Sequence, residues 1–244
     1  MMLVVSGCPR SQADSTSKKA DRGGKQMLKD EARGVLKGLE VGALDEAETE
    51  EALGVVVRGM RDNPLHVAVF GEDPEIRARR VRRLLGGAFA VMGLQRHMLA
   101  ARSADGVIVG VVGMLPPSED RPTIAQQLRL LPRLLSTGPQ AAVRAASWMG
   151  TWAKHDPEEP HWHVGPVAVD AHLQGKGVGS RLMRVFCAKM DAARENAYLE
   201  TDKPENVRFY ERFGFEVVGE QHVLDVPNWF MLRRPARRVG GLTE

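Results

Sequence analysis

A glycine-rich segment in the last third of the chain combines residue types that bind phosphate groups. It reads Gln174-Gly175-Lys176-Gly177-Val178-Gly179 and lies between an apolar run that ends at Val169 and an amphipathic run that starts at Arg181. Because glycines lack a Cβ, the backbone N–H groups of such a turn can point inward together. A helix directly after the turn adds the positive end of its macrodipole. The segment therefore predicts a pyrophosphate-binding turn between a strand and a helix.

Two common pyrophosphate motifs do not fit this segment. A P-loop has Ser or Thr directly after its lysine, whereas Lys176 is followed by Gly177. A dinucleotide-binding fingerprint that starts at Gly175 would need its third glycine where Ser180 stands. In addition, residues 170–173 separate these glycines from the preceding strand. We therefore expect neither a magnesium nucleotide nor a nicotinamide dinucleotide.

The spacing that fits is Q-x-x-G-x-G, filled by Gln174, Gly177 and Gly179. In its strand-to-helix context this pattern resembles the pyrophosphate-binding turn of the GNAT superfamily of acetyl-CoA-dependent N-acyltransferases. A second motif, N-x-x-x-Y-x-x-x-G-F, resembles the other half of the GNAT cofactor site, and it is filled by Asn206, Tyr210, Gly214 and Phe215. The resemblance covers residues 161–233 well and the first half of the chain in outline. Three short segments, 199–201, 209–212 and 227–231, resemble the puromycin N-acetyltransferase branch.

The resemblance implies an α/β GNAT fold with acetyl-CoA as co-substrate. Its sheet would be mixed and mostly antiparallel, with helices on both sides and a helical insert before the central strand. Pantetheine is expected in a slot where the central strand separates from the next strand, beside Val167, Ala168 and Val169. The pyrophosphate is expected at Gln174, Gly175, Lys176, Gly177, Val178, Gly179 and Ser180. Asn206 would bind the pantetheine arm or a nearby backbone group, although an asparagine at a helix start is otherwise usually a cap.

Acetyl transfer to an amine needs a base for the amine and a proton for the departing thiolate. By resemblance Tyr210 is the candidate acid, and the alternative is a tyrosine of the hydrophobic core. Many relatives carry a glutamate on the central strand as base, but residues 164–169 contain no acid. Glu200 on the neighbouring strand, or His163 at the start of the central strand, could act through a water molecule. A structural role remains open for both.

Two other sets of residues invite a chemical interpretation. His155, His161 and His163 include an H-x-H pair, but without further cysteines or acids at metal-site spacing this is a weak signal. We therefore predict no metal. Cys187 lies within a helical pattern without an evident neighbouring base, so we expect a buried small hydrophobe rather than a nucleophile.

The hydrophobic periodicity indicates alternating strands and helices. We expect strands over 34–41, 96–102, 106–114, 162–169 and 198–201 and from 215 onward, and helices over 44–61, from 73, from 181 and over 206–213. Asp202 and Glu205 should cap the last of these helices. Pro166 should mark a bulge in the central strand, because proline cannot donate to a sheet. The arginines between positions 77 and 83 should form a solvated face.

Residues 123–155 leave the strand pattern and contain two amphipathic stripes. The first comprises Ile124, Leu128, Leu131 and Leu135. A helical insert over about 118–158 is therefore expected before the central strand, either covering the acceptor side or only packing on the sheet. It would belong to one domain over 35–234, with a tail predicted to be disordered over 1–34 and a short tail over 235–244.

Composition limits the classes of function. The net charge is +3 in 244 residues, which does not imply nucleic acid. Two cysteines favour a reducing compartment. Neither a secretory signal pattern nor a run of ~20 apolar residues is present, so we expect no membrane contact and a cytoplasmic protein.

These observations predict an enzyme that transfers an acetyl group from acetyl-CoA to a primary amine, directly within a ternary complex. A small-molecule acceptor is the leading hypothesis, and a protein or peptide amine is the alternative. A non-catalytic module that senses acetyl-CoA is the competing class. The sequence is compatible with a homodimer as well as with a monomer.

Overall fold

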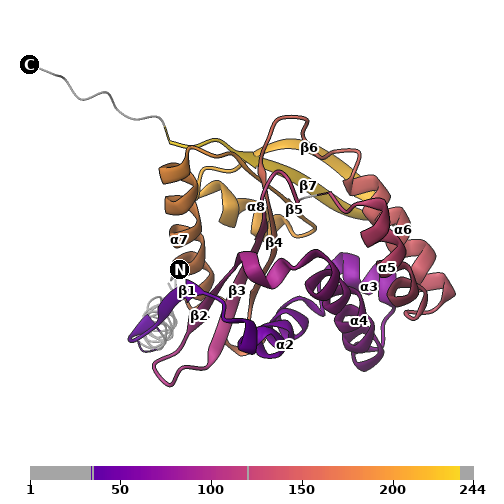
Figure 1. Cartoon of the computed structure of the whole chain (residues 1–244), viewed down its shortest axis with the longest axis horizontal. Coiled ribbons are helices and arrows are strands. Elements are labelled where there is room, and N and C mark those ends of the chain that lie inside the picture. The colour runs from indigo at the N-terminus through magenta and orange to yellow at the C-terminus, as the bar shows by residue number, and fades with distance from the viewer. Residues whose placement is uncertain (1–33, 35, 120, 237–244) are drawn as a thin grey trace, which may run out of the picture.

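The protein is described by a computed structural model over residues 34, 36–119 and 121–236. The tails predicted at 1–34 and 235–244 lie almost wholly outside these residues. The described residues form one seven-stranded sheet with helices on both sides (Figure 1). No helix among them is long and apolar enough to cross a membrane.

The strand order is β1-β2-β3-β4-β5-β7-β6, and every neighbouring pair is antiparallel except β4–β5. This confirms the mixed, mostly antiparallel sheet. The strands are β1 (Glu40–Ala43), β2 (Met98–Arg102), β3 (Ile108–Leu115), β4 (Trp162–Val169), β5 (Ala197–Thr201), β6 (Glu216–Val223) and β7 (Val226–Arg233). The helices are α2 (Thr49–Met60), α3 (Pro64–Phe70), α4 (Pro74–Met92), α5 (Ile124–Leu135), α6 (Pro139–Trp152), α7 (Val178–Ala193) and α8 (Pro204–Glu211). Three 3₁₀ turns complete the described elements: η1 (Glu46–Glu48), η2 (Leu94–His97) and η3 (Ala171–Leu173).

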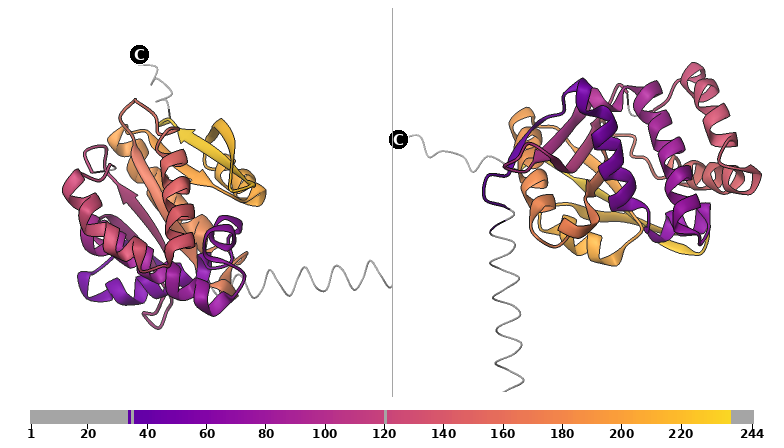
Figure 2. Two further views of the ribbon diagram at one scale, coloured as in Figure 1. Left: turned by 90° about the vertical axis from the view of Figure 1, so that its right-hand side faces the viewer. Right: turned by 90° about the horizontal axis from the view of Figure 1, so that it is seen from below.

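The sheet separates two hydrophobic cores because successive side chains of a strand point to opposite faces. In β2, Met98 and Ala100 join a core under α2, α3, α4 and α6, whereas Leu99 and Ala101 join a core under α7 and α8. We call these sides the α2 face and the α7 face. Figure 2 shows the sheet between these two groups of helices.

The first strand and the helix after α2 differ from the sequence prediction. The strand begins at Glu40 rather than Gly34. The break predicted at Asn63-Pro64 is present, but Pro64 also starts α3, which the sequence analysis missed. Proline suits the first position of a helix, since its fixed φ is helical and its missing N–H would have had no helical partner.

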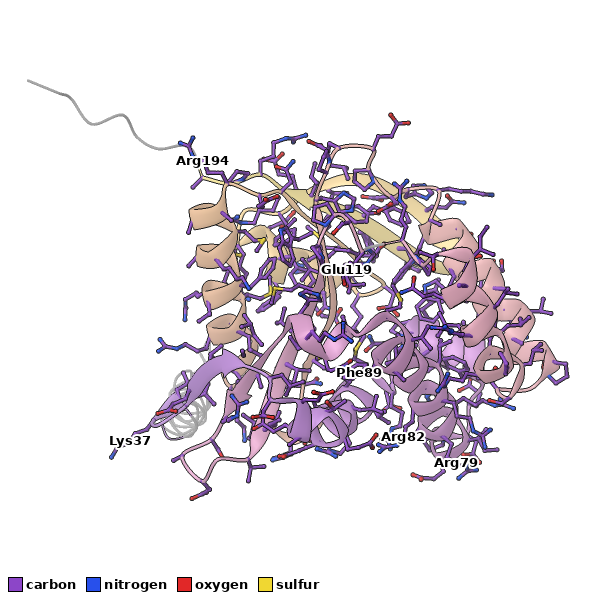
Figure 3. The ribbon with its side chains drawn as sticks, in the orientation of Figure 1. Lys37, Arg79, Arg82, Phe89, Glu119 and Arg194 are labelled. Atoms are coloured by element: carbon purple, nitrogen blue, oxygen red, sulfur yellow. The ribbon has the colours of Figure 1, made fainter. Side chains whose placement is uncertain are left out.

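The arginine-rich side of α4 is only partly solvated. Arg79 and Arg82 are exposed and point outward, as predicted (Figure 3). Arg77, in contrast, is buried; its guanidinium donates to the carbonyls of Arg61, Gly71 and Glu72 and pairs with the carboxylate of Asp62. The prediction of a fully solvated face was therefore wrong at Arg77, which ties the loop between α3 and α4 to the end of α2.

The helical insert consists of α5 and α6, which form between β3 and β4 as predicted. Helix α5 packs on α4, and α6 packs on α3 and beside β6. Trp148 of α6 is buried against the ring of His66, and Trp152 donates a hydrogen bond of 3.0 Å from Nε1 to Oδ1 of Asn228 on β7. The insert therefore forms part of the wall on the α2 face.

Candidate active site

The sheet opens between β4 and β5. These parallel strands pair only at Trp162 with Ala197 and at His163 with Tyr198, so β4 has no partner in β5 from Val164 onward. On its other edge, β4 shifts register against β3 between Val112 and Met114. This irregularity lies where a bulge was predicted at Pro166, which confirms that prediction. The slot between the two strands is the place where pantetheine was predicted to lie.

The predicted pyrophosphate turn lies at the open end of β4. Gly175 and Gly177 have φ of 76° and 94°, a backbone conformation that side chains with a Cβ rarely adopt. Helix α7 starts directly afterwards at Val178. Its first backbone N–H groups have no partner within the helix and are oriented for an anion. The turn thus has the geometry that its glycines predicted.

Gln174 orients this turn through its side-chain amide. Its Nε2 donates to the carbonyls of Gly59 and Val169, each at 3.1 Å. Gly59 approaches β4 so closely that a Cβ on it would lie 2.5 Å from the carbonyl oxygen of Val169. The turn is therefore attached to both α2 and β4.

Gly179 lies where the turn, β4 and α8 converge. A Cβ at this position would be 3.5 Å from the ring of Phe209 on α8 and 3.5 Å from Val169. A longer side chain would consequently reach into the space between β4 and α8, which is the path expected for the cofactor.

An ion pair that the sequence analysis missed lies next to the turn. Asp170 directly follows β4, and its carboxylate is 2.7 Å from Arg58 of α2 and 3.1 Å from Nδ1 of His172. Burial alone would raise the pKa of Asp170, but the contacts with Arg58 and His172 outweigh it and leave this pKa below its usual value. Asp170 therefore stays ionised and holds α2 at the end of β4.

Helix α8 carries Asn206 and Tyr210 on its α7-face side. Asn206 donates from Nδ2 to the hydroxyl oxygen of Thr201 at 3.2 Å. Tyr210 is buried between Phe209 and Phe215, and its hydroxyl has no hydrogen-bond partner among the described residues. Burial, with a smaller contribution from the charge of Asp202, raises the pKa of Tyr210 well above its usual value. The phenol is therefore neutral and keeps its proton.

The predicted acidic cap of α8 was wrong. Lys203 occupies the cap position, and no side chain caps the helix. The carboxylate of Asp202 instead accepts a hydrogen bond of 2.7 Å from the backbone N–H of Leu65 in α3. A long-range contact has displaced the local one, because Asp202 is buried at the junction of the two segments.

The two candidate bases are in contact with each other. Nε2 of His163 lies 3.1 Å from Oε2 of Glu200, whose side chain is only 4% exposed, whereas His163 is 28% exposed. Trp162 and Val164 pack on the α7 face, so His163 between them points to the α2 face. Glu200 points the same way, because its neighbour Leu199 belongs to the core of the α7 face.

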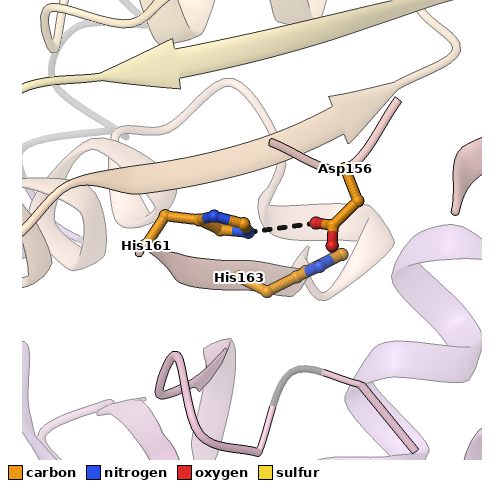
Figure 4. A group of neighbouring side chains, drawn as sticks. All are labelled: Asp156, His161 and His163. Carbon is orange, nitrogen blue, oxygen red and sulfur yellow. Dashed lines mark ion pairs between the residues drawn. The ribbon is translucent and has the colours of Figure 1, made fainter. Parts of the chain in front are cut away.

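A second group of side chains adjoins His163 (Figure 4). Asp156, His161 and His163 each place one potential ligand atom within 4.8 Å of the other two. Nδ1 of His161 is 2.8 Å from the carbonyl of Glu159, its Nε2 is 3.0 Å from Asp156, and Asp156 also binds Arg121 at 2.6 Å. Asp156 and Arg121 were missed, since they lie in loops without periodicity. His155 points elsewhere and stacks on Phe230 at 4.0 Å.

The predicted acid and the two predicted bases lie on opposite faces of the sheet. Tyr210 lies on the α7 face, together with the turn and α7, while His163 and Glu200 lie on the α2 face. Cys187, also on the α7 face, is buried, and burial raises the pKa of its thiol to about 11. It therefore stays protonated, as expected for a packing residue.

Comparisons with known proteins agree with this fold. The family model "Acetyltransferase (GNAT) family" matches residues 92–215. A Corynebacterium glutamicum structure described as histone acetyltransferase HPA2 and related acetyltransferase is 24% identical and superposes with a TM-score of 0.62, covering 83% of this chain and 99% of that chain. A polyamine N-acetyltransferase from Drosophila melanogaster is 17% identical with a TM-score of 0.52, covering 80% and 99%. Arylalkylamine N-acetyltransferase 2 from Aedes aegypti is 14% identical with a TM-score of 0.54, covering 80% and 98%.

At these identities the solved structures show a shared fold, whereas the family model assigns the sequence to a family. The matched segment contains the slot, the glycine turn, Asn206 and Tyr210. With more than half of its residues matched, the chain belongs to the GNAT acetyltransferase family, whose members transfer an acetyl group from acetyl-CoA.

Proposed function

We propose that the protein transfers the acetyl group of acetyl-CoA to the primary amine of a small molecule, directly within a ternary complex. The observation that carries this proposal is the contact between His163 and Glu200 on the α2 face, opposite Tyr210 on the α7 face. A thioester in the slot between β4 and β5 would have a proton acceptor on one side and a proton donor on the other.

Acetyl-CoA would bind through three groups of residues. The pyrophosphate would accept hydrogen bonds from backbone N–H groups of the turn, at Gly175, Lys176, Gly177, Val178, Gly179 and Ser180. Gln174 would hold that turn in place through Gly59 and Val169. Pantetheine would lie along Val167, Ala168 and Val169. Asn206, which already bonds Thr201, would support the arm at the other side of the slot.

During the reaction the nitrogen loses two protons and the departing thiolate gains one. On the α2 face, His163 would accept a proton from the incoming ammonium, directly or through water, and Glu200 would orient the imidazole and stabilise its charged form. The neutral amine nitrogen then attacks the thioester carbonyl, passes its second proton to solvent, and the C–S bond breaks to leave the amide. On the α7 face, Tyr210 would donate its proton to the departing thiolate. Solvent would restore both groups.

Acidic groups on the α2 face favour a cationic small-molecule acceptor. The side chains of Glu200 and Asp156 are 4% and 10% exposed; Asp156 is already paired with Arg121, so Glu200 would be the group that attracts an ammonium. Among proteins of the same fold, the Drosophila enzyme forms N-acetylagmatine. The motifs of residues 199–201, 209–212 and 227–231 add the resemblance to the puromycin branch. A protein or peptide amine is the alternative acceptor.

The experiment is a measurement of free CoA released from acetyl-CoA with a panel of acceptors. Diamines, arylalkylamines, aminonucleosides and lysine peptides should be compared at equal concentration. We expect release with one class of small amine, at a rate that saturates with amine concentration. Acetyl-CoA binding without release for any amine would identify a sensor, and release only with peptides would identify the alternative acceptor.

A further inference from the structure

Helix α5 carries an apolar stripe that the described residues do not cover. Ile124, Leu128, Leu131 and Leu135, which form the first amphipathic stripe of the insert, are exposed. Not one residue of α5 is buried. On α6, Val143 and Met149 are exposed as well. We call these six side chains the outer face of the insert; they are between 42% and 77% exposed.

The outer face is distinct from the side of α5 that packs on the protein. Leu130 lies against α4, where a Cβ on Gly87 would be 3.2 Å from its Cδ2, and Leu134 packs on the core of the α2 face. At ~100° per residue, Leu128, Leu131 and Leu135 fall within ~40° of Ile124 around the helix, whereas Leu130 and Leu134 lie ~80–120° away. The helix is thus apolar on two sides, and the packing of the described residues uses only one. A helix that is apolar on two sides is normally covered by other parts of a protein on both sides.

We propose that the outer face of the insert is the interface of a homodimer, in which α5 and α6 pack against the same helices of a second copy. Figure 2 shows both helices at the surface of the molecule when it is viewed from the right-hand side of Figure 1. Such an interface is isologous, because a two-fold axis packs the same patch of one copy against that of the other.

The spacing and the area of the face favour a second copy. The intervals of four, three and four residues along α5 are those of a seam between two packed helices. Six side chains of this exposure present on the order of 600 Å² of apolar surface, close to the ~800 Å² that each partner buries in a standard interface. This area is at the upper end of the ~300–600 Å² of the largest apolar patch on a typical monomer.

The charges on α5 also fit a second copy better than an anionic membrane. Arg129 and Arg133 are its charged residues, and they lie ~140° and ~180° around the helix from Ile124. Arg133 packs against α4, where its Cδ would be 2.8 Å from a Cβ on Gly87. The stripe itself is uncharged, so two copies can meet there without repulsion. A membrane-binding helix instead places basic residues along the borders of its apolar side, often with Trp or Phe within it.

The test is the molar mass in solution of the full chain at micromolar concentration, by light scattering after size exclusion, with Leu128→Glu as the variant. We expect the wild type at about twice 26.8 kDa. Leu128→Glu should raise the dimer dissociation constant ~100-fold or more, because the symmetric interface would bury the new charge twice. Val107→Glu is the matched control, since Val107 is 54% exposed in the turn between β2 and β3. It should remain a dimer.

Circular dichroism and thermal melting distinguish dissociation from unfolding. Leu128 is 64% exposed within one copy, so the monomeric variant should keep its helical signal. If Leu128→Glu unfolds, Leu131→Glu provides the second measurement. A monomeric wild type, a dimer that tolerates both glutamates on α5, or equal dissociation by Val107→Glu would overturn the proposal. Flotation of a monomeric wild type with phosphatidylserine vesicles, abolished by Leu128→Glu, would assign the face to a membrane instead.

Discussion

Nε2 of His163 lies 3.1 Å from Oε2 of Glu200; His163 is the last residue of β4 that pairs with β5, and Glu200 lies two residues beyond its strand partner Tyr198. Their contact therefore lies at the closed end of the slot. If His163 is the base, His163→Gln should lower kcat/KM for the amine by ~10²–10⁴, equivalent to ~2.7–5.4 kcal/mol of barrier. Acetyl-CoA affinity should stay within about twofold.

Glu200→Gln separates catalysis from positioning in this pair. It keeps the shape of the side chain but removes the charge that would stabilise an imidazolium, so the acid limb of the kcat/KM profile should move to lower pH. His163→Gln should remove that limb altogether. Steady-state rates across pH with a saturating cofactor measure both effects. An unchanged acid limb in His163→Gln would exclude His163 as the base.

Tyr210→Phe tests the proton donor. The ring and its packing between Phe209 and Phe215 would be kept, so melting temperature and acetyl-CoA affinity should change little. Turnover should fall ~10²–10⁴-fold. The loss should shrink with a cofactor analogue whose thiolate leaves more easily, because a better leaving group needs less protonation. Because the pKa of Tyr210 is raised, its phenol should stay protonated as the pH rises to ~10, the ordinary pKa of tyrosine. Activity that depends on this proton should therefore persist over that range. Undiminished turnover of the Phe variant would mean that Tyr210 is only a packing residue of the hydrophobic core.

Gly179→Val tests the cofactor path with less backbone strain than a change at Gly177. Gly177 has φ of 94°, so any side chain there distorts the turn. At Gly179 the space for a Cβ exists, and a branched side chain would extend toward Phe209 and Val169. Wild-type protein should gain ~2.7 kcal/mol of stability at acetyl-CoA a hundredfold above its dissociation constant. The Val variant should fold and lose most of that gain in a thermal-shift assay. Gly150→Ala, at an exposed site with open space around it, is the control and should retain it.

Trp152→Phe tests whether the insert shapes acceptor choice. The change keeps an aromatic ring beside Trp148 but removes the hydrogen bond to Asn228. We expect a higher KM for the amine and unchanged affinity for acetyl-CoA, measured by steady-state kinetics and calorimetry. Trp148 is a poorer probe, because it is buried and its truncation to Ala would cost ~3–5 kcal/mol. Equal losses for amine and cofactor in Trp152→Phe would mean that the insert only supports the fold.

Asp191→Asn tests a structural ion pair far from the slot. Both carboxylate oxygens of Asp191 lie 2.8 Å from Nη2 of the buried Arg233. Hydrogen bonding to Arg233 holds the pKa of Asp191 below its usual value despite partial burial. Its stabilising contribution is therefore present above the unfolded pKa of ~3.9 and is lost as pH falls through the lower folded pKa.

The Asn variant should accordingly be less stable by ~1–3 kcal/mol at pH 7, because the Arg233 guanidinium loses its charged partner. Denaturant unfolding should also show a shallower loss of stability than the wild type below about pH 4. Equal free energies of unfolding for the two proteins at pH 7 would contradict this account. Arg234→Ala is the control, since its pair with Glu159 is exposed.

The two cofactor motifs could be predicted from the sequence because each forms within a single strand-turn-helix segment. Gly175, Gly177 and the start of α7 are neighbours in the chain, so their spacing already determines their geometry. The bulge of β4 was likewise predicted from the position of Pro166, whereas the separation of β4 from β5 was implied by the family resemblance. Alternation along β4 and β5 places His163 and Glu200 on one face, but no pattern in the sequence predicted their contact.

The features that were missed depend on contacts between distant segments. Asp202 has the local sequence of a cap, yet the N–H of Leu65 competes for its carboxylate. Arg77 looked solvated by helical periodicity, but the carbonyls at the ends of α2 and α3 needed a buried donor. The stripe of α5 has the spacing of a buried side and is exposed in a single copy. Periodicity identifies an apolar side without saying what covers it.

The hydrogen bond between Leu65 and Asp202 also connects the two faces of the sheet. It fastens the first turn of α3, in the wall of the α2 face, to the segment that leads into α8 on the α7 face. A displacement of α8 by an incoming cofactor would pull on the N–H of Leu65, and a break would leave a buried carboxylate without that donor. The bond therefore couples α8 to α3, so a change at the cofactor side of the sheet would be felt in the wall on the opposite face.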